Sequence, residues 1–154
     1  GVHTPETETY GMHSFVFRNQ RPFHPQRFWD YLQHAYPENI IRAKGLFWIA
    51  SKPDIAINFS QAGGSSRIES AGVWWASMPF QERMQYASFE NNRAYIEQKW
   101  SKKWGDRTNE LVFIGQDMQE SQIRADLESC LCTEAEYDTY LKSSLPDPFD
   151  AFLT

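Results

Sequence analysis

The sequence has few cysteines and none of the short motifs that hold nucleotides or activate a serine. Its two cysteines, Cys130 and Cys132, are separated by one residue in a chain of 154, so they are poorly placed to bridge each other. A disulfide framework is therefore excluded, and a reducing compartment, hence a cytoplasmic location, is expected. The chain contains no G-x-x-x-x-G-K-[ST] and no G-x-S-x-G motif, which argues against a phosphate-binding loop and a nucleophilic-serine enzyme.

Positive charge and long apolar runs are also scarce. The chain has 15 Lys and Arg against 20 Asp and Glu, a formal net charge of -5, whereas a general nucleic-acid binder needs a basic stripe. No apolar run approaches the roughly 20 residues of a membrane helix, and no charged-then-apolar signal segment opens the chain. We therefore expect neither a nucleic-acid nor a membrane partner. The first residue is Gly rather than Met, which suggests a piece of a longer protein.

Aromatic residues, by contrast, are plentiful, and apolar periodicity locates the secondary structure. Rings make up 16% of the chain, enough for one domain with a sizeable core. Alternating or compact apolar patterns predict strands at residues 14–18, 40–51, 55–63, 67–77 and 110–115. Helical spacing predicts helices at 24–36, from 79 to about 100, and at 120–131, with Pro25 at a first helical position.

This order, β-α-β-β-β-(α)-β-α, predicts an α+β fold. We expect two layers, with a mixed or antiparallel sheet of about four to five strands and helices on one face. Residues 1–11 are expected to form a lead-in or linker, 12–137 the domain, and 138–154 a loosely attached tail with two prolines.

The stretch IIRAKGLFWIA (40–50) contains two cations inside an otherwise apolar strand. Alternation places Arg42, Lys44, Leu46 and Trp48 on one face and Ile41, Ala43, Gly45, Phe47 and Ile49 on the other. Two explanations remain open for the cations. Their long stems can cover apolar surface or protect a sheet edge, or they can form a contact face for an acidic partner.

The other candidate residues are histidines and cysteines. His24 precedes a predicted helix, where it can cap the helix start or act as an acid or base. His3 and His13 are weak metal candidates, and Cys130 falls on the apolar face of its helix, which favours a core role. Two alternatives therefore stay open beside a binding role: a metal-carrying module using His3, His13 and the Cys130/Cys132 pair, or a stand-alone enzyme centred on His24 with Arg42 and Lys44.

Several motifs together resemble one known family. They are RPFHPQRFWDYLQ, IIRAKGLFWIASKPD, SQAGG, GVWWASMP, WGDRTNELVFIGQDM and LESCLCTEAEY. In this order and spacing they resemble the C-terminal domain of the CobW-type GTP-binding metallochaperones, in particular the zinc-starvation-linked branch, over roughly residues 12–137.

The resemblance implies a parent protein with an N-terminal P-loop GTPase domain, a Cys-x-Cys-Cys metal motif and an often His-rich linker. Such proteins are thought to deliver metal, usually zinc, to metalloenzyme clients, and the C-terminal domain to recognise clients or the GTPase domain. GTP, Mg and Zn are then expected only in the GTPase domain, and this chain alone is expected to be non-catalytic. The GTPase half and the Cys-x-Cys-Cys motif are absent here, and CLC (130–132) is not that motif.

The carry-over of single residues is modest. The motif positions are Arg21, Pro22, His24 and Pro25; Arg42, Lys44 and Gly45; Gln61, Ala62 and Gly63; and Gly105, Asp106, Arg107 and Glu110. From these we expect partner-binding residues at Arg21, His24, Arg42, Lys44, Trp48 and Arg107. We further expect Arg21, Arg42, Lys44 and Arg107 to share a polar patch near one end of the sheet, where Gly45 permits a close backbone approach.

Overall fold

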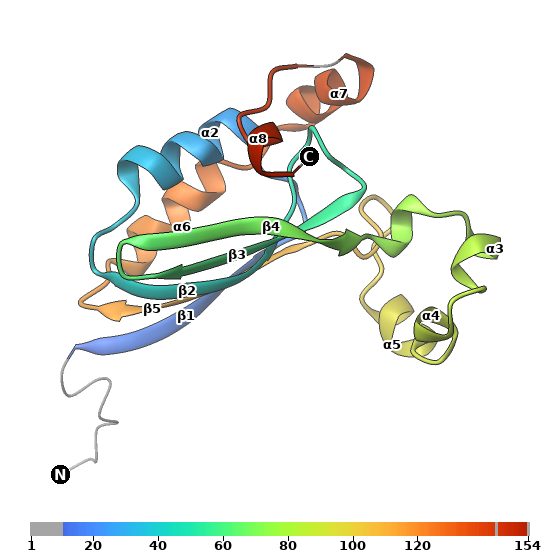
Figure 1. Ribbon diagram of the computed structural model, residues 1–154, viewed down its shortest axis with the longest axis horizontal. Coiled ribbons are helices and arrows are strands. Elements are labelled where there is room, and N and C mark those ends of the chain that lie inside the picture. The colour runs from blue at the N-terminus through green and yellow to red at the C-terminus, as the bar shows by residue number, and fades with distance from the viewer. Residues whose placement is uncertain (1–10, 144, 154) are drawn as a thin grey trace, which may run out of the picture.

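The computed structural model describes residues 11–143 and 145–153. Five strands form one antiparallel sheet in the order β1-β5-β2-β3-β4 (Figure 1). They are β1 (Met12–Asn19), β2 (Ile40–Phe47), β3 (Ile55–Ala62), β4 (Ser65–Val73) and β5 (Asn109–Gln116). The α+β prediction is confirmed. The last strand in sequence, β5, lies between β1 and β2, so the first and last strands pair at one edge of the sheet.

Helices cover one face of this sheet. They are α2 (Pro25–Asp30), its π-helical continuation η1 (Tyr31–Ala35) and α6 (Glu120–Ser129) (Figure 1). Pro25 begins α2 as predicted, and His24 caps it by accepting a hydrogen bond from the backbone N–H of Arg27. The helices bury Phe28, Tyr31, Ile123 and Leu127 against the sheet. Since the sheet contributes mostly Phe and Ile to this layer, the core is aromatic-rich.

Gly45 allows β2 and β5 to approach closely, as the sequence predicted. Its φ is +150°, and a Cβ built there would overlap the carbonyl oxygen of Glu110 on β5. An L-residue with a side chain rarely adopts this conformation, and the neighbouring strand leaves no room for one.

A helical arm (residues 74–108) connects β4 to β5 beyond the end of the sheet (Figure 1). The sequence predicted one polar helical region from residue 79 to about 100, whereas the arm has a 3-10 turn η2 (Trp75–Ser77) and three short helices, α3 (Phe80–Arg83), α4 (Ala87–Glu90) and α5 (Arg93–Gln98). Rings of Phe80, Phe89 and Trp100 surround the Arg83 guanidinium. These rings come from α3, from α4 and from the residues after α5, so the short helices fold around Arg83 and do not form one continuous helix.

The carboxyl-terminal region packs on the domain more closely than we expected. The sequence suggested a loosely attached tail at 138–154, but Phe149 is fully buried against Phe28 and Phe47. Asp147 also accepts a hydrogen bond from Ser51. Two helices not anticipated from the sequence, α7 (Glu134–Lys142) and α8 (Asp150–Leu153), flank this contact. An aromatic anchor can thus fix a proline-rich segment that has no apolar periodicity.

None of the described helices is long and apolar enough to cross a membrane.

Candidate partner-binding surface

The sheet has a second face that the described helices leave uncovered, called here the open face (Figure 1). The strand pairing fixes which residues point to it, because side chains alternate along each strand. The opposite set, which includes Phe15, Phe113 and Ala43 in one paired row, is buried under the helices. The open face therefore comprises three rows: Ser14, Ile114, Arg42, Ala62 and Ser65; Val16, Val112, Lys44, Ser60 and Arg67; and Arg18, Glu110, Leu46, Asn58 and Glu69.

Apolar side chains occupy the middle of the open face. Val16, Leu46, Val112 and Ile114, called here the apolar centre, are each only partly buried although they come from three adjacent strands. A sheet that faced only water would present polar residues at these positions. Beside them, Arg18 and Glu110 form an exposed ion pair at 3.2 Å. Covering the apolar centre with a partner would therefore remove apolar surface from water, which is favourable.

Three cations lie at one corner of the open face. Lys44 on β2 is opposite Ser60 on β3, which is opposite Arg67 on β4, and Arg42 lies two residues before Lys44. These three cations, called here the basic corner, are all exposed and line a hollow of about 420 Å³ together with Ser65 and Ser66. The prediction that Arg42 and Lys44 share a presented strand face is therefore confirmed.

The helical arm borders the open face at its other end. A hollow of about 590 Å³ is lined by Arg18 and Glu110 from the sheet and by Trp75, Tyr95 and Ile96 from the arm. Tyr95 is among the most exposed large side chains of the described residues, at 60%. The open face is thus bordered at this end by the aromatic side chains of Trp75 and Tyr95.

Trp48 does not belong to the open face, so the prediction that it shares a surface with Arg42 and Lys44 is wrong. Strand β2 ends at Phe47, and the Trp48 side chain is 0% exposed. Its ring packs against Trp104 and Tyr137, with centroids 5.6 and 5.9 Å away. Its indole N–H donates to the carbonyl of Gln20 at 2.9 Å. Trp48 is therefore a core residue at the end of the sheet.

Ile41 differs from its predicted position in the opposite way to Trp48, since it is exposed and not buried. Alternation placed it on the same face as Ala43 and Phe47, which are buried, but its side chain is 45% exposed, while Ile40 is buried. The cause is an irregularity in the β2–β5 pairing between Ile40 and Arg42. A bulge of this kind shifts the alternation by one residue.

The other two predicted arginines, Arg21 and Arg107, lie at the Trp48 end of the sheet and not at the basic corner. Arg107 lies 5.6 Å from the Trp48 ring centroid and donates to the carbonyl of Pro53 at 2.6 Å. Arg21 donates to the carbonyl of Cys132 at 3.2 Å. Arg42 pairs with Ala62 near the β3–β4 turn, at the opposite end of β2. The expected single patch of four cations is thus divided between two ends of the sheet.

Asn109 holds the Trp48 end together and was not singled out from the sequence. It is fully buried, and its side-chain oxygen accepts from the backbone N–H of Trp48 at 2.9 Å. Its amide nitrogen donates to the carbonyls of Asn19 and Arg21. These contacts join β1, β2 and β5 through one side chain. Nothing in the local sequence distinguishes this asparagine from one in a turn.

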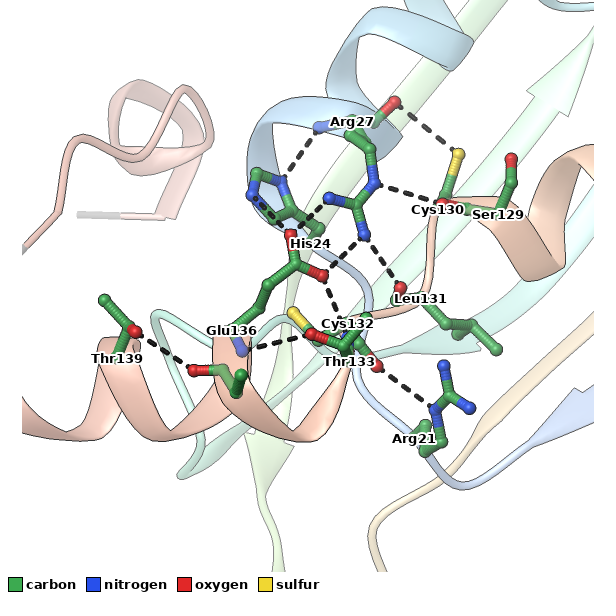
Figure 2. Close-up of polar contacts among 11 residues, drawn as sticks. Arg21, His24, Arg27, Ser129, Cys130, Leu131, Cys132, Thr133, Glu136 and Thr139 are labelled. Atoms are coloured by element: carbon green, nitrogen blue, oxygen red, sulfur yellow. Dashed lines mark hydrogen bonds and ion pairs between the residues drawn. The ribbon is translucent and has the colours of Figure 1, made fainter.

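His24 takes part in a contact between α2 and α7 (Figure 2). Its Nδ1 accepts from the backbone N–H of Arg27 at 3.2 Å, and its Nε2 lies 3.7 Å from a carboxylate oxygen of Glu136. Burial and the adjacent Arg27 lower the pKa of His24. Two roles were considered for His24 from the sequence, and these contacts support the capping role.

Arg27 and Glu136 are the main partners in this contact. The guanidinium of Arg27 makes two hydrogen bonds to the Glu136 carboxylate, at 2.5 and 2.9 Å, and also donates to the carbonyls of Ser129 and Leu131 (Figure 2). The hydrogen bond from Arg27 holds the pKa of Glu136 at about 2. Thr133 and Glu136 complete a capping box at the start of α7. This T-x-x-E pattern was the sequence signal for the helix that we did not anticipate.

The described residues contain no group of three His, Cys, Asp or Glu side chains able to hold a metal ion. Cys130 and Cys132 are free and buried, and burial raises the pKa of the Cys132 thiol to about 12. His13 lies on β1 opposite Gly115. His3, the other weak metal candidate, lies outside the described residues. The core role predicted for Cys130 is confirmed by its place in the main core.

Comparison with known proteins identifies the domain. Residues 12–131 match the family described as Cobalamin synthesis protein cobW C-terminal domain. A curated relative named Zinc-regulated GTPase metalloprotein activator 1, from Dictyostelium discoideum, is 37% identical over 139 residues, which is 88% of this chain and 28% of the relative. A zinc chaperone of Mycobacterium tuberculosis is 30% identical over 138 residues, 86% of this chain and 33% of that protein.

A solved structure has the same fold. The Zn(II)-bound YjiA GTPase from E. coli matches with a TM-score of 0.55 over 86% of this chain and 33% of that one, at 16% identity, a likeness that shows the fold alone. The chain spans about a third of the length of the relatives it matches. With its match from residue 12 to residue 131, the chain belongs to the CobW C-terminal domain family.

Proposed function

We propose that this chain is the C-terminal domain of a longer GTP-dependent zinc chaperone and acts there as a non-catalytic recognition domain. It binds either client metalloenzymes or the GTPase domain of its own parent protein. One of its relatives is named Zinc-regulated GTPase metalloprotein activator 1, and another is named a zinc chaperone. The proposal assigns GTP, Mg and Zn to the rest of the parent and places the parent in the cytoplasm.

The observation that supports a binding role is the open face. It combines a partly exposed apolar centre with exposed cations and an aromatic border, the residue types that protein interfaces favour. The cluster of ionisable side chains around His24 and Arg27 has a different role. Both residues contact Glu136, so the cluster joins α2 to α7.

The test compares the full-length parent protein with a variant that lacks residues 12–137. We expect the deletion to weaken capture of a client metalloenzyme at least tenfold, measured as the dissociation constant at a fixed nucleotide state. GTP binding by the parent's GTPase domain, measured in both proteins, is the control for an intact GTPase domain. Unchanged client capture by the deletion variant would exclude the recognition of clients by this domain.

A second measurement tests the non-catalytic part of the proposal. Isothermal titration of this chain alone with GTP and Mg is expected to give no heat of binding, and the chain is expected not to release phosphate. Titration with zinc in the presence of a competing chelator is expected to show no site tighter than about micromolar. Hydrolysis of GTP by the isolated chain would contradict the assignment.

A further inference from the structure

We propose that the open face is where the GTPase domain of the same parent protein docks, through a surface with an apolar middle and acidic side chains opposite the basic corner. This inference rests on the proposed function and deepens it, because it names the face, the partner and the partner's charge. Clients would then be recognised elsewhere on the domain, or only when the GTPase domain leaves this face.

The first support is the unused charge of the basic corner. Arg42, Lys44 and Arg67 form no ion pair in the part of the chain that the structure describes, although they lie together on β2 and β4, the two strands that flank β3. Most other cations there are engaged, as ion pairs, with backbone carbonyls or with rings; examples are Arg18, Arg27, Lys52, Arg83, Arg93, Arg107 and Arg124. The molecule has a net charge of -5. Three neighbouring cations without an acidic partner on such a molecule are therefore complementary to an external acidic group.

The second support is the apolar centre beside these cations. Lys44 and Val112 are directly paired across β2 and β5, and Arg42 is paired with Ile114. A small anion such as free phosphate would use the cations and gain nothing from Val16, Leu46, Val112 and Ile114. A folded partner covers both sets at once, with apolar contacts in the middle and charges at the rim. The combination therefore favours a protein surface over a small anionic ligand.

The third support identifies the partner as the parent's own GTPase domain. The domain forms about a third of each relative, and the solved structure with the same fold is named a GTPase. A partner joined to the domain by the chain has a high effective concentration, so a modest interface is enough to keep it docked. A free client has no such advantage and would need a larger surface.

The direct test measures the reactivity of Lys44 toward an amine-acylating reagent, by mass spectrometry, in this chain alone and in the full-length parent. We expect Lys44 to be labelled at least fivefold more slowly in the full-length protein, because docking covers it. Lys102 is the control within the same molecule. It is also an exposed lysine without an ion pair among the described residues, but its neighbours Lys103 and Trp104 contact α7 and not the open face, so its labelling should change less than twofold.

The second test mixes this chain with the parent's GTPase portion, produced separately, and measures the dissociation constant. The double variant R42E/K44E is expected to bind at least tenfold more weakly, and raising the salt from 50 to 300 mM should weaken the wild type more than the variant. The matched control is K102E/K142E, which makes the same change in net charge at two exposed lysines that are not part of the open face and should stay within twofold. Thermal unfolding of each variant shows whether it is folded.

Equal labelling of Lys44 in both proteins would overturn the inference whatever the outcome of the mixing test. Protection of Lys44 that appears only when a client metalloenzyme is added would also overturn it, since the client would then occupy the face. Either result is distinct from failure of the proposed function, in which deletion of the whole domain leaves client capture unchanged.

Discussion

The two ends of strand β2 have cations with opposite roles. At one end, Arg42 and Lys44 point from the open face to solvent and meet no acidic partner among the described residues. At the other end, the chain leaves the strand at Trp48, and nearby Arg107 is held by the carbonyl of Pro53 and the indole ring. The comparison teaches that a cation beside an aromatic strand can stabilise the fold or remain available to a partner. What decides between them is whether backbone carbonyls and rings of other segments reach it.

The largest expected effect on stability is at the Trp48 end of strand β2, called here the buried end. Trp48→Ala should lower the free energy of unfolding by about 3–5 kcal/mol, because it leaves a cavity beside Trp104 and Tyr137 and removes the hydrogen bond from the indole N–H to the carbonyl of Gln20. Urea denaturation measures this change. The control is Leu46→Ala on the open face, which should cost markedly less because Leu46 is only partly buried. Equal costs would remove the distinction between the two ends.

An intermediate effect is expected at the contact between α2 and α7. Glu136 has its pKa lowered from 4.5 to about 2 by the hydrogen bond from Arg27. A carboxyl group with a depressed pKa in the folded state stabilises the protein above its unfolded pKa, and this contribution is lost as the pH falls through the folded pKa. The stability advantage of the wild type over Glu136→Gln should therefore shrink between about pH 4.5 and pH 2.

Above that range we expect an advantage of about 1 kcal/mol, since the pair is partly exposed and screened by solvent. Urea denaturation of both proteins at pH 2.5, 4 and 6 measures it. Glu134→Gln is the control, because Glu134 lies on the same helix and its ion pair with Lys103 is more exposed to solvent; it should have the smaller effect at every pH. A pH-independent difference for Glu136→Gln would mean that the carboxylate charge contributes nothing.

Much of the fold could be predicted from local patterns, and the errors are where distant segments decide. Alternation located all five strands, and Pro25 located the first helix, because both signals act within a few residues. The position of Ile41 depends on a bulge against β5, and the burial of Phe149 depends on its ring contact with Phe28. Strand β5 is far from Ile41 in sequence, and Phe28 is far from Phe149, so no local pattern contains the information.

The candidate site was predictable to the same extent. Alternation was sufficient to place Arg42 and Lys44 on one exposed face, but Arg67 was not chosen, since its position beside them depends on the β2–β3 and β3–β4 registers. The grouping of Arg21 and Arg107 with Arg42 failed because family motifs carry no information on which end of the sheet each one occupies.

The smallest expected effect is at the basic corner, and it tests the comparison most directly. Arg42→Ala and Lys44→Ala should each change the free energy of unfolding by less than about 0.5 kcal/mol, as is usual for exposed residues without structural contacts. Arg107→Ala, the matched change at the buried end, should cost about 1–2 kcal/mol because it removes a charged hydrogen bond to Pro53 and the contact with the Trp48 ring. Urea denaturation of the three variants under one set of conditions provides the measurement. A loss at Arg42 or Lys44 as large as at Arg107 would show that these cations stabilise the isolated domain, and their exposure would then be no reason to assign them a partner.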